Sequence, residues 1–98
     1  GYSTMNIRRL VLDVDKAIAR PTLLDLANAI GSVTGVEGVN ITVEEIDIET
    51  MGMDVTVEGE NIDYPALVKA IESTGAVVHS VDQIAFGSRL VEHVKIQR

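Results

Sequence analysis

Hydrophobic residues in this chain follow two different periods, and the order of those periods limits the folds open to it. Four runs read as strands: residues 6–14, 35–50, 53–59 and 76–86, with the two-residue alternation of a strand clearest in the second and third. Two runs repeat every three to four residues, as the buried stripe of a helix does: residues 21–35 and 63–75. The expected helix stripes are Leu23, Leu26, Ala27, Ile30 and Val33 in the first and Tyr64, Leu67, Val68 and Ile71 in the second.

The order strand, helix, strand, strand, helix, strand predicts an α+β fold with two similar halves. Such halves form a ferredoxin-like βαββαβ two-layer sandwich, with a four-stranded antiparallel sheet and two helices on one face. Residues 6–14 are apolar on both faces, so this strand is expected to be central. We expect one domain over residues 5–87, a cloning remnant at residues 1–4 ahead of Met5, and a separate C-terminal tail at residues 88–98.

Residues that end helices and interrupt strands add detail to this prediction. Thr22 and Asp25 have the spacing of a capping box, and Asp63 is placed to cap the second helix. In the second strand, apolar residues occupy odd positions up to Val43 and even positions from Ile46. One extra residue near Glu44 and Glu45 restores the register, so we predict a β-bulge on an edge strand. Residues 50–52 are expected to form the following hairpin turn, and residues 15–20 a loop.

Composition excludes several classes of function. The chain has no cysteine, which excludes disulfides, thiolate metal sites and cysteine catalysis, and is compatible with a reducing, cytoplasmic compartment. The net charge is −7, and the eight Lys and Arg residues are scattered, so we expect no nucleic-acid partner. No apolar run approaches the ~20 residues of a membrane span, so no membrane partner is expected either.

Five segments resemble a small archaeal family: RLVLDV, GVEGVNITVEEID, VTVEG, AIES followed by a glycine, and VHSVDQI. The family is domain-of-unknown-function family 211, and the resemblance covers about residues 5–94. It implies a ferredoxin-like fold and ring-like homo-oligomers, with no established activity and no site residues to transfer. A weaker resemblance links GVEGV, VTVEG and LVKAIESTGA to heavy-metal-associated domains, but their paired-cysteine loop corresponds here to DVDKAIARP, which has no thiol.

A first candidate metal site consists of Asp13, Asp15, Glu58 and His79. Asp13 and Asp15 lie near the end of the first strand, and an antiparallel fourth strand brings the start of that strand, with His79, close to them. A third strand running parallel to the first would place Glu58 at the same end. Carboxylates with an imidazole suit a hard or borderline cation. The alternative is that these groups are solvated strand-end charges and a hydrogen-bonded histidine.

A second candidate metal site consists of Glu44, Glu45 and Asp47, with Glu49 nearby. Carboxylates at a bulged edge could splay and share Ca²⁺ or Mg²⁺, although their spacing does not match an EF-hand loop. The alternative is that charged residues keep this edge strand from pairing with other chains.

No catalytic site is expected. His79, Ser80 and Asp82 contain the residue types of a catalytic triad, but adjacent strand residues diverge and no oxyanion hole is visible. We therefore expect a protein that is not an enzyme, with catalysis of unknown type as a distant alternative. His93 is expected to be a surface residue or, at an interface, a pH-sensitive one.

The tail is too apolar for a solvated segment, and we expect a short helical turn or an added strand there. Its apolar residues are expected to form a subunit interface: Leu90, Val91, Val94 and Ile96. The partner expected is a second copy of the chain, in a cyclic homo-oligomer. The leading functional hypothesis is a non-catalytic oligomeric module, with a small-molecule ligand at the subunit interfaces as a possible addition. The runner-up is a Ca²⁺- or Mg²⁺-binding protein; no other cofactor is expected.

Overall fold

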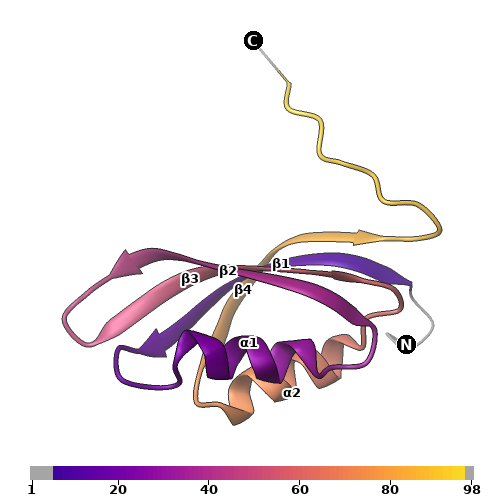
Figure 1. Cartoon of the computed structure of the whole chain (residues 1–98). Helices are drawn as coiled ribbons and strands as arrows, with labels where there is room; N and C mark the ends of the chain where they lie inside the picture. Colours follow the sequence, from indigo (N-terminus) through magenta and orange to yellow (C-terminus); the bar gives the residue numbers. More distant parts are fainter. Residues whose placement is uncertain (1–5, 97–98) are drawn as a thin grey trace.

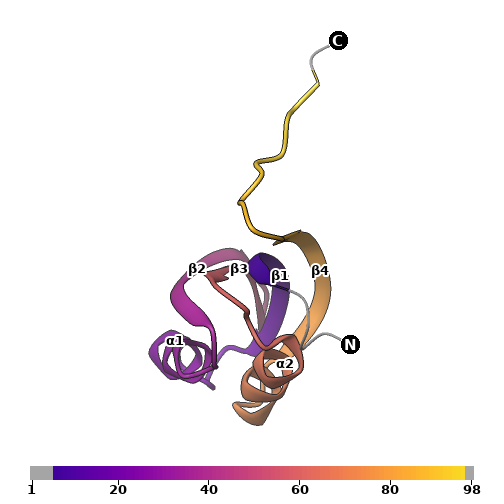
Figure 2. The same ribbon diagram turned by 90° about the vertical axis from the view of Figure 1, so that its right-hand side faces the viewer.

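Six elements follow the order that the hydrophobic periods predict, in a computed structural model that describes residues 6–96 (Figure 1). Their bounds are β1 Ile7–Ala17, α1 Leu23–Gly31, β2 Val36–Ile46, β3 Thr50–Gly59, α2 Tyr64–Ser73 and β4 Val77–Phe86. The strands form one antiparallel sheet in the order β2-β3-β1-β4, so β1 is central and β2 is at an edge, as predicted. Both helices cover one face of the sheet and leave the other face open (Figure 2). This is the predicted ferredoxin-like α+β sandwich.

The core lies between the helices and the two central strands. Every second residue of β1 is apolar and pairs with an apolar residue of β3: Leu10 with Val57, Leu12 with Val55 and Val14 with Met53. Cross-strand partners share a face, so these six side chains form one apolar layer, and all are fully buried. The helices contribute the opposite layer, with Leu26, Ile30, Leu67 and Ile71 fully buried. Leu23, expected in the first stripe, is instead exposed at the start of α1.

Both helices begin at the residues predicted from the sequence. The Thr22 hydroxyl accepts a hydrogen bond from the Asp25 backbone N–H at 3.1 Å. The Asp63 carboxylate accepts one from the Ala66 N–H, also at 3.1 Å. Each cap satisfies a backbone donor that has no partner within the helix. After α2, Gly75 has a φ of 102°, a left-handed conformation that favours glycine.

The predicted bulge is present, but the predicted turn is not. The pairing of β2 with β3 shifts register between Val43 and Glu45, which moves Ile46 into line with Met51. The hairpin turn is formed by residues 47–49, whereas residues 50–52 belong to β3. The Asp47 carboxylate accepts a hydrogen bond from the Ile48 N–H at 2.8 Å, so an aspartate rather than a glycine turns the chain.

β1 is longer than predicted, since residues 15–17 continue the strand instead of opening a loop. Asp15 pairs with Gly52 and Ala17 with Thr50. Lys16, between them, is buried, and its ammonium group donates hydrogen bonds to the backbone carbonyls of Ala17 and Ile18 at 2.9 and 3.1 Å. These bonds compensate for the partial loss of water around the ammonium group. The extension places Asp15 within the sheet.

The tail leaves the end of β4 and rises on the open side of the sheet (Figures 1 and 2). It bends at residues 87–89, and over residues 90–96 it forms neither the helical turn nor the strand expected. Its four apolar residues, Leu90, Val91, Val94 and Ile96, are exposed. Residues 1–4, expected to be a cloning remnant, lie outside the described residues. No helix within residues 6–96 has both the length and the apolar composition needed to cross a bilayer.

Candidate functional site

Acidic residues surround a hollow on the open side of the sheet, near the β2–β3 hairpin. The hollow has a volume of about 390 Å³. Its lining contains six carboxylates and one imidazole: Asp13, Asp15, Glu44, Glu45, Asp47 and Asp54, with His79, Thr50 and Gly52. Apart from Glu58 and Glu49, the residues of the two acidic groups predicted separately from the sequence therefore surround a single space.

Strand pairing brings these residues together. In one row across the sheet, Asp15 pairs with Gly52, and Gly52 pairs with Glu45. Two residues along, Asp13 pairs with Asp54. Residues two apart on a strand share a face, and so do cross-strand partners, so these carboxylates occupy the face that the helices leave open. The bulge after Val43 aligns Glu45 with this row.

Gly52 leaves room at the floor of the hollow. A Cβ atom at this position would lie 3.3 Å from Asp15 Oδ1 and 3.7 Å from Glu45 Cβ. The first distance is shorter than an ordinary van der Waals contact. Any larger residue would therefore displace one of the two carboxylates or fill the space between them.

The carboxylates line the hollow without converging on one point. One basic–acidic pair lines the hollow: His79 Nδ1 lies 3.8 Å from Asp15 Oδ2, and both side chains are largely exposed. An exposed pair of this kind contributes at most about 1 kcal/mol to stability. Within residues 6–96, no three Asp, Glu or His side chains are close enough to hold one metal ion. A cation would require these side chains to move toward it.

Glu58 does not belong to this site, and its predicted position was wrong. β3 runs antiparallel to β1, not parallel, so Glu58 lies opposite Arg9 at the start of β1. There Arg9 Nε donates a hydrogen bond to Glu58 Oε2 at 2.8 Å. Asp54, which sequence reasoning missed, takes the place expected for Glu58. Its position follows from the antiparallel register and from the polar alternation of β3.

The triad residues take separate partners. Ser80 Oγ donates a hydrogen bond to Asp82 Oδ1 at 2.8 Å, whereas His79 approaches Asp15. Among the described side chains, no hydrogen bond joins His79 to Ser80, so this segment lacks a serine activated by a histidine. His93 lies on the exposed tail, beside β4.

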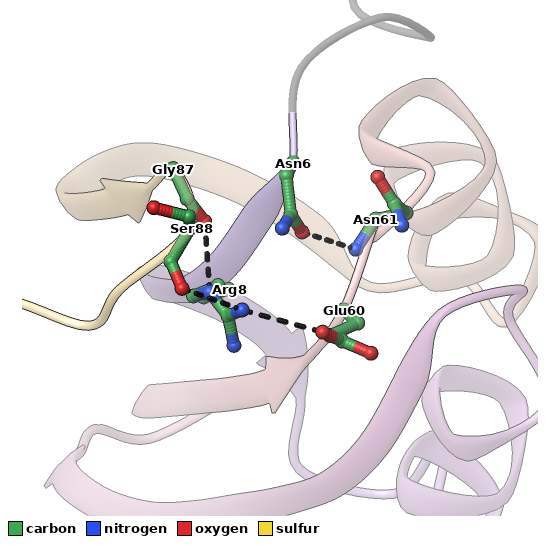
Figure 3. Close-up of polar contacts among 6 residues, drawn as sticks. All are labelled: Asn6, Arg8, Glu60, Asn61, Gly87 and Ser88. Atoms are coloured by element: carbon green, nitrogen blue, oxygen red, sulfur yellow. Dashed lines mark hydrogen bonds and ion pairs between the residues drawn. The ribbon is translucent and has the colours of Figure 1, made fainter.

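Two arginines of β1 hold the root of the tail, a feature that the sequence analysis did not predict. Arg8 donates to the carbonyls of Gly87 and Ser88 at 2.8 and 3.0 Å, and also to Glu60 (Figure 3). Arg9 forms a two-point contact with the tail, from Nη1 and Nη2 to the two oxygens of Glu92, at 2.7 and 3.0 Å.

The contact with Glu92 changes the ionisation of both partners. Hydrogen bonds from Arg9, reinforced by its positive charge, lower the pKa of Glu92 below its ordinary value of 4.5. Hydrogen bonds with Glu92 and Glu58 raise the pKa of Arg9 further above its already high value. The tail is therefore held by a charged pair up to Glu92, and the residues beyond Glu92 project from the body.

Comparison with known proteins places the chain among relatives without an assigned activity. The sequence profile of the family described as uncharacterised ArCR proteins, domain-of-unknown-function family 211, matches residues 8–98. The uncharacterized protein MJ0319 of Methanocaldococcus jannaschii, an archaeon, is 43% identical over 89 residues, which cover 91% of each chain. The chain therefore belongs to domain-of-unknown-function family 211.

Proposed function

We propose that this protein is a non-catalytic module that associates with copies of itself through its C-terminal tail. The observation that carries the proposal is the exposure of Val91, Val94 and Ile96, which are 73–78% exposed in the single chain. Their attachment is ordered, because Arg8 and Arg9 hold the tail up to Glu92. Exposed apolar residues on an anchored segment are typical of interaction sites.

Energetic arguments support a subunit contact. Fully burying a large aliphatic side chain contributes about 1.5–3 kcal/mol, so three such residues could offset much of the cost of association. Holding the root of the tail in advance lowers the conformational entropy that association would remove. Identical chains that join by unlike surfaces close into rings when the geometry allows, which favours a cyclic homo-oligomer.

Truncation tests the proposal directly. A chain ending at Gly87 keeps the hydrogen bond from the Gly87 N–H to the Asn6 carbonyl and the contact of Arg8 with the Gly87 carbonyl. We expect it to fold, as judged by thermal unfolding, and to sediment as a monomer at concentrations where the full chain is oligomeric. A chain ending at Ile96 is the matched control and should sediment as the full chain does. An unchanged oligomer after truncation at Gly87 would rule out the proposal.

A divalent-cation site is the second candidate, favoured by the six carboxylates around the space at Gly52. Ca²⁺ and Mg²⁺ prefer oxygen ligands of this kind. Calorimetric titration with Ca²⁺, Mg²⁺, Mn²⁺ and Zn²⁺ tests it, with Gly52→Ala expected to weaken binding. Gly38→Ala is the control, since a Cβ there meets no atom within 4 Å. Absence of heat with all four ions would exclude the cation site.

Two further points belong to the proposal. A small-molecule ligand between subunits is proposed by analogy with other regulatory domains of this fold, which is an argument from fold alone. The lack of cysteine favours a cytoplasmic location. Oligomerisation in the presence and absence of candidate metabolites would test the first point.

A further inference from the structure

The tip of the β2–β3 hairpin, residues 44–50, has the properties of an acceptor for the tail. We propose that the tail of one copy, residues 88–96, docks on the hairpin tip of a second copy. This inference rests on the proposed self-association and identifies the surface that receives the tail.

The hairpin tip exposes large apolar side chains. Ile46 is 69% exposed and Ile48 is 91% exposed. Ile46 pairs with Met51, which in turn pairs with Lys16, so Ile46 shares the sheet face that carries the core. The hairpin extends beyond the ends of both helices, so this part of the face has no helix over it (Figure 1).

The charges of the two segments are complementary. The hairpin tip alternates its isoleucines with Glu44, Glu45, Asp47 and Glu49. Arg9 already neutralises Glu92 of the tail. Among the described residues, the tail cations Arg89 and Lys95 have no ion-pair partner. The tail therefore carries net positive charge and the hairpin tip net negative charge, which favours their encounter and disfavours contact between two tails.

In the single chain the root of the tail and the hairpin tip lie at opposite ends of β1 (Figure 1). At one end of β1, the Gly87 N–H donates a hydrogen bond to the carbonyl of Asn6, just before the strand. At the other end of β1, Ala17 pairs with Thr50 of the hairpin tip. The eight residues from Arg9 to Ala17 span roughly 26 Å at about 3.3 Å per residue. The described tail leaves the sheet at the end away from the hairpin tip, so the tip of each copy stays open to the tail of another copy (Figure 1).

Such a contact joins two different surfaces, so every copy is both donor and acceptor. This heterologous arrangement generates a closed ring or an open chain. A chain that lacks either surface can make only one contact. Two complementary defects should therefore yield pairs and nothing larger, which provides a sharp test.

The test combines a chain ending at Gly87, which has no donor, with a chain carrying Ile46→Ser and Ile48→Ser, which has no acceptor. Both isoleucines are exposed, so the second chain should retain its fold, as thermal unfolding will show. In sedimentation velocity each variant alone should be monomeric, and an equal mixture should form a 1:1 heterodimer. Leu24→Ser, at an exposed position on α1, is the control and should assemble as the unaltered chain does.

The outcomes separate the two proposals. If the chain ending at Gly87 assembles by itself, the proposed self-association through the tail fails. If that chain is monomeric but the Ile46→Ser, Ile48→Ser chain assembles normally, the tail docks elsewhere, such as on the β4 edge, and only the hairpin assignment fails. A mixture of two monomeric variants without heterodimer also overturns the hairpin assignment.

Charge reversal provides a second test that does not depend on the isoleucine variants. Lys95→Glu should weaken assembly about tenfold at low salt, because it places a negative charge against the acidic hairpin tip. Raising the ionic strength should reduce this difference. A Lys95→Glu chain that assembles as tightly as the unaltered chain would overturn the charge match.

Discussion

Shortening the apolar side chains at the end of the tail should weaken self-association by a predictable amount. Val94→Ala removes two carbon atoms from a side chain that is 78% exposed in the single chain, and Ile96→Ala removes three from one that is 75% exposed. At about 0.8 kcal/mol per buried CH₂ group, burial of only the exposed fraction is worth about 1.2 kcal/mol for Val94 and about 1.8 kcal/mol for Ile96. The double variant should therefore lose about 3 kcal/mol per contact, or roughly a hundredfold in dissociation constant.

The assay is a dilution series by sedimentation velocity, with chemical unfolding of the monomer as a parallel measurement. Because both residues are exposed in the single chain, the free energy of unfolding of the monomer should change by less than about 0.5 kcal/mol. Leu24→Ala, at a position 82% exposed on α1, is the matched control and should leave the dissociation constant unchanged. A change of less than about threefold in the double variant would refute the reasoning, since even half of the calculated burial exceeds it.

Three further predictions concern the fold and the root of the tail. Leu12→Ala, at a fully buried position in the central strand, should lower the free energy of unfolding by about 2–5 kcal/mol in a urea titration, and a loss below about 1 kcal/mol would contradict the packing described. Gly35 has a φ of 93°, and a Cβ there would lie 2.5 Å from the Glu60 carbonyl oxygen. Gly35→Ala should therefore lower the free energy of unfolding by more than about 1 kcal/mol, whereas Gly38→Ala should change it by less than about 0.5 kcal/mol. Arg9 lowers the pKa of Glu92, so the tail contact should be present above pH 4.5 and be lost as the pH falls through the lowered pKa. The ¹³C shift of the Glu92 side-chain carboxylate reports it, and a contact that dissolves well above pH 4.5 would contradict the ion pair.

Local patterns were sufficient for most of the fold. Apolar runs, strand alternation and three-to-four-residue spacing identified all four strands and both helices, and Thr22 and Asp63 marked where the helices begin. The change of parity after Val43 located the bulge, because a strand with one buried face cannot change parity without an extra residue. These features depend on neighbours within a few residues, so the sequence alone specifies them.

The candidate site was predictable only in part, because it depends on which strands pair and in which direction. Asp13, Asp15 and His79 were correctly expected near one another, but the second acidic group joins them only because Gly52 lies between Asp15 and Glu45 in the sheet. Direction also decided that Asp54 lies at the hollow while Glu58 bonds to Arg9 at the other end of β1.

The sequence by itself determined the element order, the buried faces, the bulge and the surplus of apolar residues in the tail. Only the tertiary structure decided which acidic residues share a hollow, that Arg8 and Arg9 hold the root of the tail, and that the hairpin tip lies at the opposite end of β1. The physical reason is the distance along the sequence over which each feature acts. Periodicity and capping depend on residues a few positions apart, whereas the pairing of strands joins residues tens of positions apart, and no local pattern encodes which strands pair.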